Sequence, residues 1–204
     1  MNIIMTGSTS FVGAATVREL LRRGHTVTAI VRPDSSKLDT ILEGNEEALL
    51  TGHLLVTEND LSEPEKLLEK VTKPQDVFCH FGWGGSGSAS RTDKALQEKN
   101  MEISLETIRT AKALGCKKFL FSGSQAEYGM HQDLITEDTV CEPKSLYGEA
   151  KLAMREKGEK LCDELGLRYI HARIFSAYGP GDHPWTLVES CLDTFLSNKE
   201  MSLG

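Results

Sequence analysis

Two side chains that could transfer protons stand four residues apart, in Tyr147-Gly-Glu-Ala-Lys151. On a helix, this spacing places the phenol and the ammonium group on one face. A neighbouring cation favours phenolate over phenol, so it lowers a tyrosine pKa that begins at about 10 and allows proton exchange near neutral pH. Taken alone, the pattern is also common by chance on a solvated helix face. A catalytic role for this pair therefore requires further functional side chains elsewhere in the chain.

A second group of hydroxyls follows the apolar segment 117–121, in Ser122-Gly-Ser124. If this segment is a strand that precedes the helix of Tyr147, Ser124 could hydrogen-bond the same substrate oxygen as the phenol. A hydroxyl donor, a phenol and a lysine in one cleft predict proton transfer coupled to hydride transfer between an alcohol and a nicotinamide cofactor.

The N-terminus contains a candidate site for the pyrophosphate of such a cofactor. An apolar run ends at Gly7, and Gly13 begins a segment with helical spacing of apolar residues, so the order is strand, tight loop and helix. Glycine permits a close backbone approach, and a helix N-terminus attracts an anion. Ser10 stands where a middle glycine would complete the usual pattern. An ordinary strand-to-helix turn is the alternative.

The remaining chain alternates short apolar segments with helical patterns, which predicts βαβ units and a parallel sheet with right-handed crossovers. Strands are expected at 3–5, 26–31, 53–57, 76–81, 117–122 and 167–173, and long helices at about 92–114 and 146–165. The predicted fold class is α/β, a Rossmann doubly wound parallel sheet of order 3-2-1-4-5-6 flanked by helices. In such sheets the ligand lies outside the carboxyl ends of the strands.

Composition excludes several other functions. The net charge of -7, without a Lys/Arg block, argues against a nucleic-acid partner. No apolar run is long enough to cross a membrane, so we expect a cytoplasmic protein without a membrane partner. The five cysteines are far apart and lack a C-x-x-C pair, so we predict no metal site.

At this point the chain resembles the extended short-chain dehydrogenase/reductases of the NAD-dependent epimerase/dehydratase family, in its UDP-galactose 4-epimerase-like branch. The resemblance covers residues 1–184. Its motifs occur in the family's order and spacing: Thr6-Gly7 with Gly13, Asn59-Asp60-Leu61, His80-Phe-Gly-Trp83, Asn100, Ser122-Gly-Ser124, Pro143-x-Ser-x-Tyr147-x-x-x-Lys151 and Arg173-x-Phe-x-x-Tyr178-Gly-Pro180.

The resemblance implies a role for each matching position. The catalytic residues would be Tyr147 as general acid/base, Lys151 as the group that lowers its pKa and binds the nicotinamide ribose, and Ser124 as the residue that orients the reacting oxygen. Cofactor contacts would come from Gly7, Ser10, Phe11, Val12, Gly13, Arg32, Asp60, Leu61, Phe81, Gly82, Tyr147 and Lys151. Substrate contacts would come from Trp83, Ser124, Gln125, Glu127 and Ser176.

The sequence departs from the family pattern at three places. Val31 and Arg32 stand where an NAD-preferring member carries an acid, and a guanidinium favours a 2′-phosphate, so we predict NADP, with NAD as the alternative. Gln125 follows Ser124 where a dehydratase needs an acid, and Glu127 lies one place too far along. Ser176 replaces a common asparagine. Because no acid directly follows Ser124, dehydration is less favoured than C4 epimerisation or reduction of a 4-keto sugar nucleotide.

The resemblance also implies a domain organisation and a partner. Residues 1–184 would form the NAD(P)-binding Rossmann domain, and residues 185–204 the start of a truncated substrate-binding region, with the C-terminal substrate lobe largely absent. A homodimer would pair through the two long helices. Two other functions stay open: a non-catalytic NAD(P)-sensing module, and a reductase of a non-sugar carbonyl. A polar set near the expected cleft mouth favours a sugar substrate over an apolar ring: Ser86, Ser88, Arg91, Gln125 and Glu127.

Overall fold

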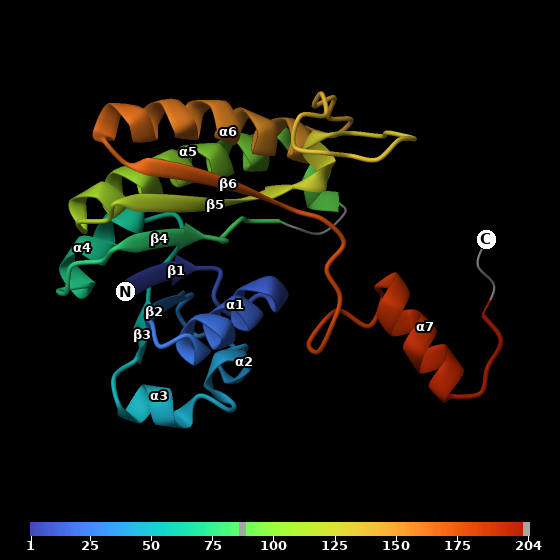
Figure 1. The fold of residues 1–204 in the computed structure, drawn as a ribbon, viewed down its shortest axis with the longest axis horizontal. Helices are drawn as coiled ribbons and strands as arrows, with labels where there is room; N and C mark the ends of the chain where they lie inside the picture. Colours follow the sequence, from blue (N-terminus) through green and yellow to red (C-terminus); the bar gives the residue numbers. More distant parts are fainter. Residues whose placement is uncertain (86–88, 202–204) are drawn as a thin grey trace. The chain divides into compact units, whose positions relative to one another are not determined.

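A computed structural model describes residues 1–85 and 89–201, which leaves Ser86 and Ser88 outside the described residues. Its centre is a parallel sheet of six strands in the order β3-β2-β1-β4-β5-β6, which confirms the predicted topology (Figure 1). The strands are β1 (Asn2–Thr6), β2 (Thr26–Val31), β3 (Leu54–Glu58), β4 (Val77–His80), β5 (Lys118–Ser124) and β6 (Arg168–Ile174).

Helices connect the strands, as expected for parallel neighbours. The α-helices are α1 (Phe11–Arg22), α2 (Asp39–Leu42), α3 (Glu46–Leu50), α4 (Leu67–Lys70), α5 (Lys94–Ala113), α6 (Leu146–Leu165) and α7 (Leu187–Leu196). The described residues also form short 3₁₀ turns: η1 (Pro64–Lys66), η2 (Ala89–Thr92) and η3 (Gln125–Glu127).

Each face of the sheet has its own apolar core. On one face, Phe78 and Phe119 from the strands pack with Ile108 of α5 and Met154 of α6. On the other face, Ile3 and Val27 belong to a cluster that includes Val17 of α1. Figure 1 shows α5 and α6 side by side over one face of the sheet. Because both faces are covered, the central strands β1, β2 and β4 are largely apolar and buried instead of alternating.

The ends of α6 follow from local sequence. Ser145 adopts extended backbone angles, and its side chain accepts a hydrogen bond from the Gly148 N–H, which satisfies a free donor of the first turn. Gly166 ends the helix with a φ of 67°, a conformation that favours glycine. The first turn also lies against η3: a Cβ at Gly148 would overlap the carbonyl oxygen of Ala126. This glycine therefore sets how closely Tyr147 approaches the end of β5.

The chain divides into two compact units, residues 1–174 and 175–204, and the first unit ends with β6. In the second unit, α7 buries none of its residues, and Trp185, Leu187 and Phe195 are exposed. The predicted homodimer would pair through α5 and α6. Among residues 1–85 and 89–201, neither helix carries an exposed large apolar side chain, and the homodimer stays a prediction. No helix within these ranges has both the length and the apolar character of a membrane span.

We predict that Gly148→Ala destabilises the fold, because the added methyl group must push α6 away from η3. The expected loss is about 1–3 kcal/mol of unfolding free energy, measured by urea denaturation. Glu149→Ala, at the exposed neighbouring position, is the matched control and should change stability by less than about 0.5 kcal/mol. Equal stability of the two variants would contradict the close contact between α6 and η3.

Candidate active site

In the loop after β1, backbone atoms approach one another closely. Gly7 has a φ of 68°, and a Cβ at this position would lie 2.7 Å from the carbonyl carbon of Phe81. The Ser10 side chain caps α1 by accepting a hydrogen bond from the Gly13 N–H at 3.1 Å. A Cβ at Gly13 would overlap the Gly7 carbonyl oxygen. Both glycines are thus required by close approach, and the N-terminus of α1 is left facing outward from the sheet edge.

A cavity of ≈ 330 Å³ lies at the carboxyl ends of β1 to β4. Seven of the predicted cofactor residues line it: Gly7, Ser10, Arg32, Asp60, Leu61, Phe81 and Gly82. Trp83 and Lys37 line it as well, and Lys37 is a cation that the sequence analysis did not single out. Of the other predicted cofactor contacts, Phe11, Val12 and Gly13 lie in the first turn of α1, and Tyr147 and Lys151 lie on α6.

The carboxylate of Asp60 is held locally. Its Oδ1 accepts hydrogen bonds from the N–H and the hydroxyl of Ser62, at 2.8 and 2.6 Å. These bonds, helped by the charges of Lys99 and Arg32, hold the pKa of Asp60 below its ordinary value. Asp60 is therefore an anion that faces the same cavity as Arg32 and Lys37.

A buried histidine connects the strands beneath this cavity. The Ser104 hydroxyl donates to the Asn100 carbonyl at 2.7 Å, so it accepts from His80 Nε2–H at 3.1 Å. His80 Nδ1 is then the acceptor for the Thr6 hydroxyl at 2.8 Å. Burial, followed by the charge of Lys151, lowers the pKa of His80 to about 3 and keeps it neutral. Thr6 in turn accepts the Gly82 N–H at 3.3 Å, which fixes the backbone at the cavity wall.

Lys151 projects from α6 to the end of β5. It is 2% exposed, and its Nζ donates a hydrogen bond to the Ser122 carbonyl oxygen at 2.8 Å. The Nζ also lies 4.0 Å from the ring centroid of Trp83 and 4.6 Å from that of Phe121. Burial lowers the pKa of Lys151 to about 7, so this lysine exchanges its proton near neutral pH.

Tyr147 lies one turn earlier on α6, with its ring centroid 5.7 Å from the Lys151 Nζ. Burial raises the pKa of Tyr147, while a hydrogen bond with Ser124 and the charge of Arg91 act in the opposite direction. The predicted lowering of this pKa by Lys151 is therefore wrong for this structure, because burial outweighs the neighbouring positive charges. The structure does bring Ser124, Tyr147 and Lys151 together, as predicted from their spacing.

Glu127 does not reach the cavity as a substrate contact, which corrects that prediction. Its side chain is fully buried, whereas Gln125 is exposed. The carboxylate accepts hydrogen bonds from the Ser124 N–H at 2.7 Å, from Arg173 Nε at 2.7 Å and from His171 Nε2 at 2.9 Å. The carboxylate is completely buried and these donors occupy both of its oxygens, so it presents no surface to a substrate.

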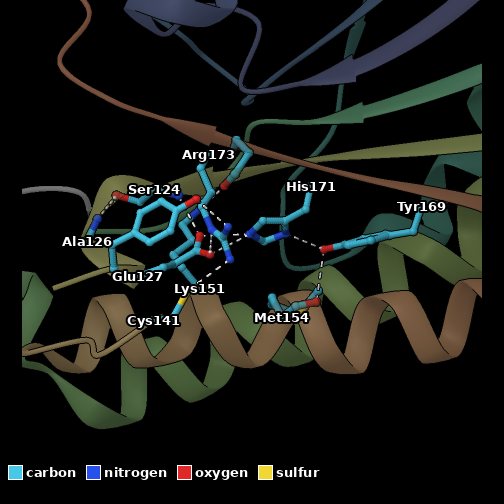
Figure 2. Close-up of polar contacts among 11 residues, drawn as sticks. Ser124, Ala126, Glu127, Cys141, Lys151, Met154, Tyr169, His171 and Arg173 are labelled. Carbon is cyan, nitrogen blue, oxygen red and sulfur yellow. Dashed lines mark hydrogen bonds and ion pairs between the residues drawn. The ribbon is translucent and has the colours of Figure 1, made fainter. Parts of the chain in front are cut away.

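The charges and hydroxyls around Glu127 form a connected network (Figure 2). Arg173 also donates to the Tyr128 hydroxyl at 2.8 Å and contacts the Cys141 sulfur at 3.2 Å. His171 Nδ1 lies 3.1 Å from the Tyr169 hydroxyl. The network thus joins the end of β6 to the backbone of Ser124. Hydrogen bonds from His171, Arg173 and the Ser124 N–H outweigh burial and lower the pKa of Glu127.

Sequence reasoning missed this network, although a signal was present. Tyr169, His171 and Arg173 alternate along β6, so their side chains share one face of the strand. Three polar side chains on one face of a strand in a covered sheet predict a buried partner of opposite charge. Glu127 is that partner, but it lies far from β6 in the sequence, so the pairing is not apparent from local spacing.

The parallel sheet in this strand order, with a glycine turn after its first strand, is the architecture of Rossmann-type dinucleotide-binding proteins. The sequence model of the NAD dependent epimerase/dehydratase family matches residues 3–203. The chain belongs to this family. The match confirms the resemblance described above.

Individual relatives agree with this assignment. A UDP-glucose 4-epimerase of Pisum sativum is 28% identical over 87% of this chain and 52% of its own length. A dTDP-6-deoxy-L-talose 4-dehydrogenase (NAD(+)) of Aggregatibacter actinomycetemcomitans is 29% identical over 83% of this chain and 60% of its own. The structure of Thermus thermophilus UDP-glucose 4-epimerase in complex with NAD superposes with a TM-score of 0.79 at 20% identity, covering 100% of this chain and 65% of that one.

The chain spans only part of the length of the curated relatives that it matches, between 52% and 65% for four of them. Within residues 1–85 and 89–201, no group of three His, Cys, Asp or Glu side chains is placed to hold a metal ion.

We predict that Glu127→Gln lowers the unfolding free energy at pH 7 by about 3 kcal/mol, because an amide cannot accept from three converging donors. Since the folded-state pKa of Glu127 lies below its ordinary value of 4.5, its stabilisation is present above that pH and is lost as the pH falls through the folded-state value. Urea unfolding at pH 3 to 7 should therefore show the two proteins converging in acid.

The matched control is Glu106→Gln, which alters an exposed ion pair with Arg109 at 3.1 Å. It should change stability by at most about 1 kcal/mol at any of these pH values. A Glu127→Gln variant as stable as this control at pH 7 would contradict the buried network.

Proposed function

We propose that this chain binds a nicotinamide dinucleotide and catalyses C4 epimerisation of a UDP-sugar, or reduction of a 4-keto sugar nucleotide, with Tyr147 as general acid/base. One observation carries the proposal: Ser124, Tyr147 and Lys151 meet at the end of β5, and Trp83 connects them to the cavity behind Gly7. The relatives named as UDP-glucose 4-epimerases support the substrate class.

The residues present fit a dinucleotide. Gly7 and Gly13 leave no space for a Cβ, so the loop backbone and the α1 N-terminus can approach a pyrophosphate closely. Arg32 and Asp60 lie in the same cavity, where the adenosine half would bind. A nicotinamide cofactor held there would supply reversible hydride transfer with the sugar carbon.

The chain's own residues would handle the proton. In the oxidation step, Tyr147 Oη takes the proton from the C4 hydroxyl, and in the reduction step it returns a proton to the 4-keto oxygen. Ser124 is placed to hydrogen-bond the same oxygen, and Lys151 supplies positive charge next to the phenolate that forms. The raised pKa of Tyr147 favours the phenol, which is the form that donates the proton in the reduction step, whereas the oxidation step starts from the phenolate that Lys151 stabilises. Lys151 is buried and Ser124 and Tyr147 are half-buried, which limits the access of water.

We expect Tyr147→Phe to lower kcat by about 10²–10⁴-fold, because the phenyl ring cannot carry the proton. The assay is interconversion of UDP-glucose and UDP-galactose with added NAD or NADP, and NADH fluorescence measures cofactor binding in parallel. Cofactor affinity should remain within about 3-fold of the wild type. Turnover unchanged by this substitution would refute the assignment. Cofactor binding without turnover of a panel of sugar nucleotides by the wild type would favour an NAD(P)-sensing module.

We also propose that the cofactor is NADP, with NAD as the alternative. Arg32 and Lys37 supply two cations beside the expected adenosine ribose, and a guanidinium pairs with phosphate through charge-assisted hydrogen bonds. A related structure contains NAD, so the choice at this site needs a direct measurement.

We predict that NADPH binds more tightly than NADH, and that Arg32→Ala weakens NADPH binding about 10-fold or more while NADH binding changes little. Isothermal titration calorimetry gives both dissociation constants. Arg23→Ala, which removes an exposed arginine paired with Glu19 on α1, is the control and should alter neither. Tighter binding of NADH by the wild type would overturn the preference.

A further inference from the structure

The indole of Trp83 covers the ammonium group of Lys151. The Lys151 Nζ lies 4.0 Å from the centroid of the indole, closer than to the rings of Phe121 or Tyr147. The same indole meets Tyr147 edge to face, with ring centroids 6.3 Å apart and an interplanar angle of 87°. It also meets Phe121 at 5.9 Å and 75°. One side chain therefore contacts both members of the Tyr147–Lys151 pair.

The position of the indole is itself fixed. Trp83 Nε1–H donates to Gln97 Oε1 at 3.0 Å, and the Gln97 amide donates to the Ser90 carbonyl at 2.9 Å. Gln97 is 2% exposed, so this pair is sheltered from solvent. The next residue, Gly84, is held by the Asn100 side chain, which accepts from its N–H at 3.0 Å and donates to its carbonyl at 2.8 Å. Two buried amides of α5 thus hold the segment that carries the indole.

A buried ammonium group needs electrostatic compensation, and the aromatic faces supply part of it. A cation over the face of tryptophan is stabilised by the ring quadrupole, more strongly when it is desolvated. The other titratable groups around Lys151 are Glu127 of η3, whose charge favours the ammonium form, the neutral His80 of β4 and Tyr147 of its own helix. Glu127 is already engaged by Ser124, His171 and Arg173.

We propose that Trp83 is a positioning residue for the Tyr147–Lys151 pair: its indole face keeps the Lys151 ammonium charged and against the Ser122 carbonyl, and its edge fixes the Tyr147 ring. For catalysis this inference rests on the proposed function. It replaces a direct substrate contact as the main role of Trp83, which the sequence analysis had predicted. The surface of the indole that lines the cavity would then border the reacting centre without binding the sugar.

The direct test is a pH titration of Lys151 in the cofactor-free protein by NMR, with ¹³C at the lysine Cε and the signal assigned by its loss in Lys151→Met. The wild-type midpoint should lie at about 7. Trp83→Leu keeps an apolar side chain but removes the ring face, so the midpoint should fall by about one pH unit. Trp83→Phe, which retains a smaller ring face, should give a smaller fall.

Trp185→Phe is the matched control, because Trp185 lies in the second unit, where it stacks on His183 with centroids 4.3 Å apart. Its midpoint should equal that of the wild type. If Trp83→Leu does not unfold cooperatively, Trp83→Phe and Gln97→Met, which removes the acceptor of the indole N–H, decide the question, because each should lower the Lys151 midpoint below that of the wild type. An unchanged or higher midpoint in the folded Trp83 variants would overturn the proposal.

A second experiment, steady-state kinetics, distinguishes a failure of this inference from a failure of the proposed function. With UDP-glucose as the probe, kcat of Trp83→Leu at pH 7 should fall several-fold, with the alkaline limb of its pH profile about one unit lower and KM changed by less than about 3-fold. A raised KM at constant kcat would instead indicate a substrate contact and overturn the positioning role. If the wild type turns over no sugar nucleotide, the proposed function fails, and the NMR midpoints still decide whether Trp83 holds Lys151.

Discussion

The hydrogen bond from the buried Lys151 ammonium to the Ser122 carbonyl is the interaction on which the site depends. It joins α6 to the end of β5, and these two elements carry Tyr147 and Ser124. Burying the ammonium charge of Lys151 costs free energy. The aromatic faces around it and the charge of the nearby Glu127 offset this cost. The same burial brings the lysine's proton affinity close to neutrality, which links the stability of this contact to the chemistry proposed for it.

A second, separate set of buried charges supports the other side of the same strand end. Glu127 holds the Ser124 N–H and joins it to Arg173 and His171 on β6. The backbone of β5 is therefore held at Ser122 by a cation and at Ser124 by an anion. Side chains that are fixed in this way lose little conformational entropy when substrate binds, which is what preorganised catalysis requires.

The sequence was sufficient for the sheet order, because apolar strands, long helices and turn glycines all indicated the same βαβ pattern. It was also sufficient to bring Ser124, Tyr147 and Lys151 together, since topology fixes where strand ends meet. It failed for Glu127, because a shift of one position in the turn after β5 moves a side chain from the cavity to the interior. The pKa of Tyr147 and the place of Trp83 over Lys151 depend on burial and packing between distant segments, which spacing along the chain does not encode.

The central claim is that the Tyr147–Lys151 pair shares a pocket with a nicotinamide ring held by the β1–α1 loop. A crystal structure of this chain with bound NADPH measures this directly. The account predicts the pyrophosphate at the N-terminus of α1 and the nicotinamide ribose within hydrogen-bond distance of Lys151 Nζ, with the ring next to Tyr147 Oη. A nicotinamide ring bound away from Tyr147, or a dinucleotide outside the cavity behind Gly7, would contradict it.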